Sequence, residues 1–353
     1  MIGDGRKRNS GSLGAKRAFA AAVGALAIAF AGAAMAQEKP ALKKATLVVE
    51  WIGYQPQHFG FWIAKERGWY ADAGFDLEIK GTRGSAQVLQ IMTGKGGDFS
   101  MVAASSYAQA MGGKTPLPLK VVAMWGQKDI LSVAYFESTG IKTLHDFEGR
   151  TMGIVPGSMA HIIWPAFTKS VNIDAGKVKL QNWDFRSYFG IWGAKKVDIS
   201  GNSALGTTSP AMFKKRQNEI VKQVAFSHYL PLLGPAVMVH NDTIANDPES
   251  VRKFVKVTQR AWEYLRDKPK EATLEAAKIV FANYEKIDPV EDLAEYSLEV
   301  IPDYMVSDST KGKPIGWMNP DDWRKMTALL KENDPGMTSL PAVEDMMTNR
   351  FVE

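Results

Sequence analysis

The feature that most constrains the fold is a regular alternation of strand and helix patterns in residues 45–106. Residues 75–79 alternate apolar and charged side chains with a period of two, which is typical of a strand. Because parallel strands need long crossover connections, this alternation predicts an α/β unit with a parallel sheet. The predicted strands are 45–51, 75–79 and 98–102, and the predicted helices are 59–66, with Gly68 as its left-handed C-cap, and 86–93.

A second series of the same kind follows in residues 131–226, where strand patterns again alternate with helix patterns. The strand pattern at 235–240 then returns toward the first unit. Three helices of the remaining chain are preceded by Asp-Pro or Asn-Pro, which combine an N-cap with a proline in the first turn. These pairs begin at Asp247, Asp288 and Asn319, ahead of predicted helices 251–267, 291–301 and 323–331.

Two glycine–serine pairs occupy corresponding places in the two α/β units. Gly84-Ser85 and Gly157-Ser158 each connect a predicted strand to the start of a predicted helix. Helix N-termini offer free backbone N–H groups and a positive dipole end, which favour an anionic or hydrogen-bond-accepting ligand group. Ordinary capping by serine is the alternative interpretation. The repetition in both units favours two halves of one ligand site.

Aromatic side chains give a second argument for a ligand site. Trp51, Tyr54 and Trp125 lie at or just beyond predicted strand ends, where flat rings suit a planar ligand. Packing beneath a loop is the competing interpretation. Arg83 has the planar fork that pairs with a carboxylate or sulfonate. The candidate ligand-binding residues are Trp51, Tyr54, His58, Arg83, Gly84, Ser85, Ser105, Ser106, Trp125, Gly157, Ser158 and Asp184.

The first 36 residues have the three parts of a secretory signal peptide. A basic start is followed by the apolar run 18–35 and by the small-residue site Ala34-Met35-Ala36, so cleavage is expected after Ala36. An uncleaved membrane anchor is the alternative, because the apolar run is nearly long enough to span a bilayer. The predicted location of the mature protein is the periplasm.

Composition excludes several classes of function. The chain has no cysteine, which excludes disulfides, thiolate metal sites and a cysteine nucleophile. Four of the five net positive charges belong to the first 17 residues, so the mature chain is nearly neutral and nucleic acid is not an expected partner. The five histidines are scattered, and no nucleophile elbow or phosphate loop is present. We therefore expect no metal, no cofactor and no catalysis.

Several short motifs occur in a characteristic order along the chain. Trp51, His58 and Gly60 are followed by Ala64-Lys65-Glu66-Arg67-Gly68-Trp69-Tyr70 and Gly74-Phe75-Asp76-Leu77-Glu78. Later motifs are Asp146-Phe147-Glu148-Gly149, Asn241-Asp242-Thr243-Ile244-Ala245 and the closing Met347-Thr348-Asn349-Arg350-Phe351. In this order the chain resembles bacterial ABC-importer solute-binding proteins, in the subgroup that carries thiamine-pyrimidine precursors, nitrate, sulfonates and taurine.

This resemblance implies a two-lobed fold of the type II periplasmic binding proteins, in which two α/β domains joined by two crossover strands enclose a ligand cleft. The first lobe would comprise residues 40–130 and 235–353, and the second residues 131–234, after a signal peptide at 1–36. The resemblance also implies a monomeric receptor, not an enzyme, that delivers a small ligand to an ABC permease in the inner membrane.

The ligand itself is not identified by any motif. The aromatic residues favour a planar compound, and the best single candidate is a pyrimidine precursor of thiamine. A small organic anion, such as an alkanesulfonate, taurine, nitrate or an aromatic carboxylate, is the alternative. A third interpretation is an enzyme like the fungal proteins that synthesise the thiamine pyrimidine on this fold, although the resemblance there includes a cysteine-rich motif. A receptor for a membrane kinase would use the same cleft.

Overall fold

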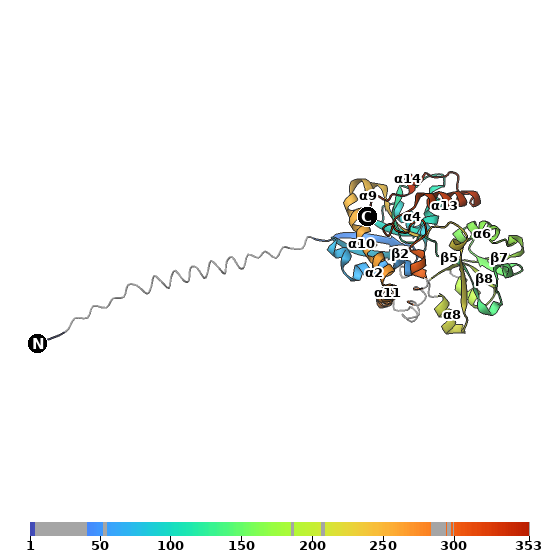
Figure 1. Cartoon of the computed structure of the whole chain (residues 1–353), viewed down its shortest axis with the longest axis horizontal. Helices are drawn as coiled ribbons and strands as arrows, with labels where there is room; N and C mark the ends of the chain where they lie inside the picture. The colour runs from blue at the N-terminus through green and yellow to red at the C-terminus, as the bar shows by residue number, and fades with distance from the viewer. Residues whose placement is uncertain are drawn as a thin grey trace. The chain divides into compact units, whose positions relative to one another are not determined.

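The computed structural model describes residues 1–3, 41–51, 55–184, 187–205, 209–283, 294, 298 and 300–352. The residues from Leu42 to Glu353 form one compact unit. This unit contains two five-stranded sheets with helices packed against them (Figure 1). The predicted α/β fold class is therefore confirmed. The predicted signal peptide and its cleavage site lie outside the described residues, apart from residues 1–3.

The first sheet has the strand order β2-β1-β3-β10-β4. Strand β1 pairs in parallel with β2 and β3, whereas β10 is antiparallel to both β3 and β4. Every residue of β10 is buried, which accounts for its nearly uninterrupted apolar sequence. The strands are β1 (Lys43–Val49), β2 (Phe75–Gly81), β3 (Phe99–Ala103), β4 (Leu119–Met124) and β10 (Pro235–His240).

The second sheet, of order β7-β6-β8-β5-β9, repeats this arrangement. Strand β6 is parallel to β7 and β8, and β5 is antiparallel to β8 and β9. Each sheet thus has its antiparallel strand in the fourth place. Along the chain, β5 of the second sheet follows β4 of the first sheet, and β10 of the first sheet follows β9 of the second. The chain therefore crosses between the sheets twice. The strands are β5 (Leu131–Phe136), β6 (Thr151–Ile154), β7 (Lys179–Asn182), β8 (Ile199–Ala204) and β9 (Val221–Ala225).

The helices that precede β5 or follow β10 belong to the part of the chain that forms the first sheet. The helices between β5 and β10 belong to the part that forms the second sheet. The first group is η1 (Pro56–His58), α2 (Phe59–Glu66), α3 (Trp69–Asp72), α4 (Ser85–Thr93), α5 (Ala104–Met111), α9 (Asn241–Asn246), α10 (Pro248–Asp267), α11 (Pro269–Asn283), α13 (Pro320–Asn333) and α14 (Val343–Met346). The second group is η2 (Glu137–Thr139), η3 (Leu144–Phe147), α6 (Met159–Ser170), η4 (Ala175–Lys177), α7 (Tyr188–Gly193), α8 (Ser209–Gln217) and η5 (Phe226–His228).

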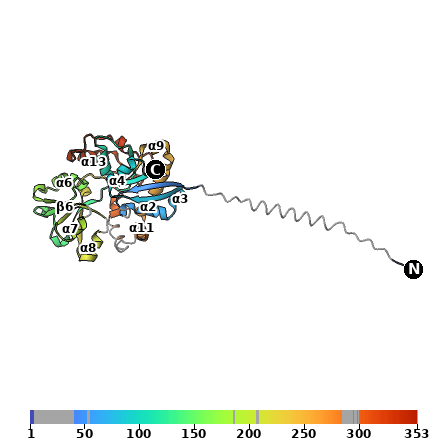
Figure 2. The same ribbon diagram turned by 180° about the vertical axis from the view of Figure 1, so that it is seen from behind.

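Segments far apart in the sequence are held together by packing. Helix α2 packs against α10 and α11, so the early and late parts of the chain lie side by side (Figure 1 and Figure 2). Phe254 of α10 stacks on Phe99 of β3 with ring centroids 3.8 Å apart, and on Tyr70 at 5.1 Å. Helix α13 contacts both α5 and α6, which belong to different sheets' parts of the chain.

The local signals of the sequence predicted helix ends well. Gly68 has the expected left-handed backbone, with φ of 72°. Asp247 accepts a hydrogen bond from the Ser250 N–H at 3.1 Å, and Asn319 accepts one from the Asp321 N–H at 2.9 Å. Both helices begin at the proline that follows the cap, which is earlier than predicted. The cap at Asp288, and most of the helix predicted after it, lie outside the described residues.

In the described ranges, no helix combines the length and apolar character needed to cross a bilayer.

Candidate functional site

The carboxyl end of β1 gathers the first group of predicted ligand residues. Trp51 follows this strand with a φ of 62°, an uncommon backbone conformation for a bulky side chain. Its carbonyl accepts a hydrogen bond from the Thr82 N–H at 2.7 Å. The indole lies over Gly84, where a Cβ would come 3.7 Å from the ring. Because strained backbone persists only where the surroundings impose it, Trp51 is held in place at this strand end.

Glu50 immediately precedes Trp51 and was not among the residues predicted from the sequence. Its side chain is buried, and Oε2 accepts hydrogen bonds from the Ser85 hydroxyl at 2.6 Å and from the Ala103 N–H at 3.3 Å. The carboxyl therefore joins the ends of β1 and β3 to the first residue of α4. A glutamate that ends an otherwise apolar strand pattern, one residue before the candidate Trp51, is the signal that points to it in the sequence.

The pKa of Glu50 reflects this burial. Desolvation raises the pKa of the carboxyl from its usual 4.5 to about 7, while the hydrogen bonds from Ser85 and Ala103 lower it. The negative charge of Asp129 raises it further. Near neutral pH, Glu50 is therefore protonated to a larger extent than an exposed glutamate.

Asp129 is a second buried carboxyl in this region, and it too was absent from the sequence-based predictions. The Ser105 hydroxyl donates to Asp129 Oδ2 at 2.8 Å, and the Leu131 N–H donates to Oδ1 at 2.9 Å. Burial raises the pKa of Asp129, and both hydrogen bonds oppose this effect. Ser105, predicted as a ligand donor or helix cap, thus directs its hydroxyl to a carboxylate. Ser106 is half-buried in the first turn of α5.

Two other predicted residues are enclosed by the protein. His58 is fully buried, and its Nδ1 accepts a hydrogen bond from the Gln55 N–H at 3.1 Å. Burial lowers the pKa of His58 to about 3, with the Glu50 carbonyl acting in the opposite sense, so the ring is neutral. Neutral imidazole with an accepting Nδ1 carries its proton on Nε2. Trp125 is also buried, within the core cluster around α10.

The second sheet carries a corresponding group at the ends of β6, β7 and β8. Ser158 caps α6 by accepting from the His161 N–H at 3.3 Å, and its hydroxyl also accepts from Asn202 Nδ2 at 2.9 Å. Asn202 in turn accepts from the Val155 N–H at 2.7 Å and from Trp183 Nε1 at 3.4 Å. Gly157 is exposed, with φ of 73°.

The two serines therefore differ in their local roles. Ser158 is the N-cap of its helix, whereas Gly84 occupies that position in α4 and Ser85 is the first helical residue. Instead of capping, Ser85 donates its hydroxyl proton to Glu50. Both glycine–serine pairs follow parallel strands, but not corresponding ones: Gly84-Ser85 follows β2, the first strand of its sheet, whereas Gly157-Ser158 follows β6, the second strand of the other sheet. The correspondence expected from the sequence is therefore wrong, and only Ser158 is an ordinary capping serine.

The remaining predicted residues lie at the edges of these groups. Asp184 is exposed and accepts a hydrogen bond from the Ser187 N–H at 2.9 Å. Arg83 is exposed, and its backbone N–H donates a hydrogen bond to the Gln87 side-chain oxygen at 2.9 Å. Tyr54 lies outside the described residues. The structure thus brings Trp51, Gly84, Ser85 and Ser105 to the end of the first sheet, and Gly157, Ser158 and Asp184 to the end of the second.

Close packing in the second group gives a testable prediction at Gly153. A Cβ on Gly153 would lie 2.3 Å from ring carbons of the buried Trp183. Gly153→Ala is therefore expected to displace this ring and to reduce the free energy of unfolding by about 1–3 kcal/mol. Urea unfolding followed by tryptophan fluorescence measures both effects. Gly190→Ala is the control, since no heavy atom outside its own stretch of helix lies within 4 Å of the added methyl group. If both variants lost the same free energy of unfolding, the contact between residue 153 and the Trp183 ring would not be the cause.

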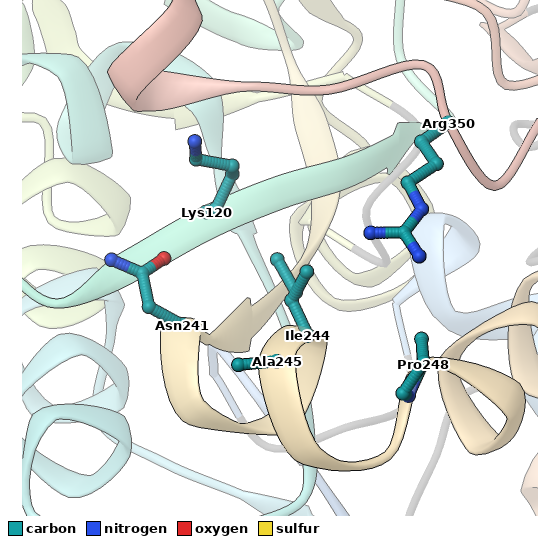
Figure 3. A pocket seen from close by; sticks show the side chains of 6 residues that line it. All are labelled: Lys120, Asn241, Ile244, Ala245, Pro248 and Arg350. Atoms are coloured by element: carbon teal, nitrogen blue, oxygen red, sulfur yellow. The ribbon is translucent and has the colours of Figure 1, made fainter.

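A shallow surface pocket of about 280 Å³ lies elsewhere on the first sheet's part of the chain (Figure 3). It is lined by Lys120, near the start of β4, and by residues that follow the end of the antiparallel β10. Figure 3 shows the Arg350 guanidinium extending toward Ile244. Strand β10 is antiparallel to β3, and β3 is parallel to β1. The end of β10, and with it this pocket, therefore lies at the opposite end of the sheet's strands from Glu50 and Trp51. It is not the site predicted from the sequence.

No group of three or more histidine, aspartate or glutamate side chains is arranged to hold a metal ion within the part of the chain that the structure describes.

Solved structures define the class of fold. The periplasmic aliphatic sulphonate binding protein SsuA from Escherichia coli superposes with a TM-score of 0.65 at 10% identity, over 86% of this chain and 92% of that one. The periplasmic nitrate-binding protein NrtA from Synechocystis PCC 6803 gives a TM-score of 0.63 at 14% identity, over 88% of this chain and 87% of that one. The fold is that of the type II periplasmic binding proteins, as the resemblance in the sequence implied.

The family is shown by the sequence itself. Residues 55–272, more than half of the chain, match the family described as NMT1/THI5 like, and the chain belongs to this family. A protein of Brucella abortus that is named as a binding protein is 22% identical over 280 residues, which cover 76% of this chain and 82% of that protein.

Proposed function

We propose that this protein is an extracytoplasmic receptor that binds a small solute and delivers it to an ABC importer. The observation that carries the proposal is that a glycine–serine turn lies at the carboxyl end of a parallel strand in each of the two sheets. Family membership and the type II fold support it, because similar solved structures include periplasmic binding proteins for aliphatic sulphonate and for nitrate. Such proteins hold their ligand between two lobes.

In this proposal, residues 40–130 and 235–353 form the first lobe and residues 131–234 form the second. Ligand contacts both lobes only when they are closed, so its binding energy shifts the population toward the closed form. Trp51 supplies a flat face for a planar ligand, and the turns at Gly84 and Gly157 approach it from either lobe. The best single candidate remains a pyrimidine precursor of thiamine, with a small organic anion as the alternative.

A ligand screen tests this function directly. Pyrimidines, alkanesulfonates, taurine, nitrate and aromatic acids are added separately to the mature protein, and the melting temperature is measured. A ligand at one hundred times its Kd is expected to add about 2.7 kcal/mol to the free energy of unfolding. Small-angle scattering should show a smaller radius of gyration with the same compound. Turnover of a bound compound without a transporter would instead support the enzyme interpretation.

Trp51→Ala tests the predicted stacking face. We expect binding of the compound found in the screen to weaken by roughly 10- to 100-fold, the range for loss of one aromatic stacking partner of a planar heterocycle. Isothermal titration measures the change. Trp69→Ala is the matched control, because Trp69 packs against Arg260, whose guanidinium lies 3.8 Å from its ring centroid, and is outside the predicted site. Unchanged affinity in Trp51→Ala would remove this residue from the site.

A further inference from the structure

The two buried carboxyls at the end of the first sheet bear on the charge of the ligand. Glu50 is 4% exposed and Asp129 is 5% exposed. They are close enough for the charge of Asp129 to raise the pKa of Glu50. Each is joined to a predicted ligand residue by a serine hydroxyl, Ser85 for Glu50 and Ser105 for Asp129. The first-lobe part of the predicted site therefore contains two buried carboxyl groups, Glu50 and Asp129.

Neither of these carboxyls forms an ion pair with a cationic side chain among the described residues, and Arg83, beside Gly84, is exposed to solvent. The groups that lower the pKa of either carboxyl are hydroxyl and backbone N–H donors. His58, the basic side chain beside the Glu50 backbone, is neutral because burial lowers its pKa to about 3. Buried carboxylates are costly without a positive partner, and an added anion would increase the repulsion.

An independent observation points to a missing polar contact nearby. Oε1 of Gln57, which is 1% exposed, has no hydrogen-bond partner within the ranges that the structure describes, whereas the ring of the neighbouring His58 has the Glu50 carbonyl as a partner. Buried polar atoms are nearly always satisfied by protein, water or ligand. An unpaired acceptor on Gln57 suits a ligand that donates hydrogen bonds.

From this arrangement we propose that Glu50 is a specificity-determining residue, which selects a ligand with N–H donors, neutral or cationic, and disfavours organic anions. The inference rests on the proposed function and decides between its two ligand classes. An aromatic amine or amidine would donate to the Glu50 carboxyl and stack on Trp51. A sulfonate, nitrate or carboxylate in the same place would face Glu50 and Asp129, neither of which is paired with a cation.

Matched pairs of probes that share a ring and differ in charge test this selection. Benzamidine is compared with benzoate, and 4-aminopyrimidine with pyrimidine-4-carboxylate, by isothermal titration at pH 7.5. In the wild-type protein the nitrogen compound of each pair should bind at least about 10-fold more tightly. Glu50→Gln should reduce this preference by roughly 10- to 100-fold, the range for a hydrogen bond to a charged group.

The ratio within each pair separates specificity from a structural effect, because misfolding would weaken both members alike. Glu219→Gln is the control: this carboxyl pairs with Lys195 and Ser138 in the second sheet's part of the chain, so its loss should leave the ratio unchanged. Tighter binding of the anions, or an unchanged ratio in Glu50→Gln, would overturn the inference while the receptor role stands. If neither these probes nor the wider screen shift the melting temperature, the receptor role itself fails and the inference with it.

Discussion

Replacing Glu50 by glutamine is expected to stabilise the ligand-free protein by about 3 kcal/mol at pH 8 and by less than about 1 kcal/mol at pH 5. The pKa of this carboxyl rises from 4.5 to about 7 on folding, mainly because the side chain is buried. Between these two values the folded protein binds more protons than the unfolded chain, so stability falls as pH rises through this window. Glutamine retains an acceptor for Ser85 and Ala103 and has no charge to bury.

Urea unfolding of both proteins between pH 4.5 and 8.5 measures this difference. Two other titrating groups face Glu50, namely Asp129, whose pKa is also raised, and His58, whose lowered pKa removes stability as pH falls below its usual 6.5. Both are present in wild type and variant, so the comparison isolates Glu50. A stability difference that is the same at every pH would show that Glu50 is not the titrating group.

Phe254→Ala is expected to reduce the free energy of unfolding by about 3–5 kcal/mol, the range for truncating a buried aromatic ring. Phe254 of α10 is fully buried and stacks on Phe99 at 3.8 Å and on Tyr70 at 5.1 Å between ring centroids. Its ring attaches the late part of the chain to the sheet that carries Glu50 and Trp51. Removing it leaves a cavity beneath this sheet.

The same substitution at an exposed ring is the control for this prediction. Phe281 of α11 is 44% exposed, and Phe281→Ala should change the free energy of unfolding by no more than about 0.5 kcal/mol. Urea unfolding followed by circular dichroism compares the two variants. A loss below about 1 kcal/mol in Phe254→Ala would mean that the ring cluster contributes little to holding α10 against the first sheet.

Much of the local structure was predictable from the sequence. The predicted bounds of α2 and β10 agree with the structure, because each segment has a clear apolar pattern and clear end signals. The return of residues 235–240 to the first sheet was also predicted. Helix α9 was missed, since its six residues have no apolar face. The starts of α10 and α13 were placed late because each helix was predicted to begin only after the proline and the acidic residues of its first turn.

The site was predictable only in part, and the reason is the same for each omission. Trp51, Gly84 and Ser85 lie at the carboxyl ends of strands predicted to be parallel, so they were expected to converge. Glu50 was passed over as a residue within the predicted strand 45–51, and Asp129 as part of a connection. Their importance depends on burial, and burial of a single carboxyl is decided by residues far away in the chain.

The sequence by itself determined the kinds of element, their order, the helix caps and the membership in a family, because periodicity and capping act over a few neighbouring residues. The tertiary structure decided which strands run antiparallel in each sheet and which hydroxyl meets which carboxyl. Ser85 lies 35 positions from Glu50, and Ser105 lies 24 positions from Asp129. Only the folded chain removes water from these pairs, and it is this desolvation that raises their pKa values and gives the proposed site its chemical preference.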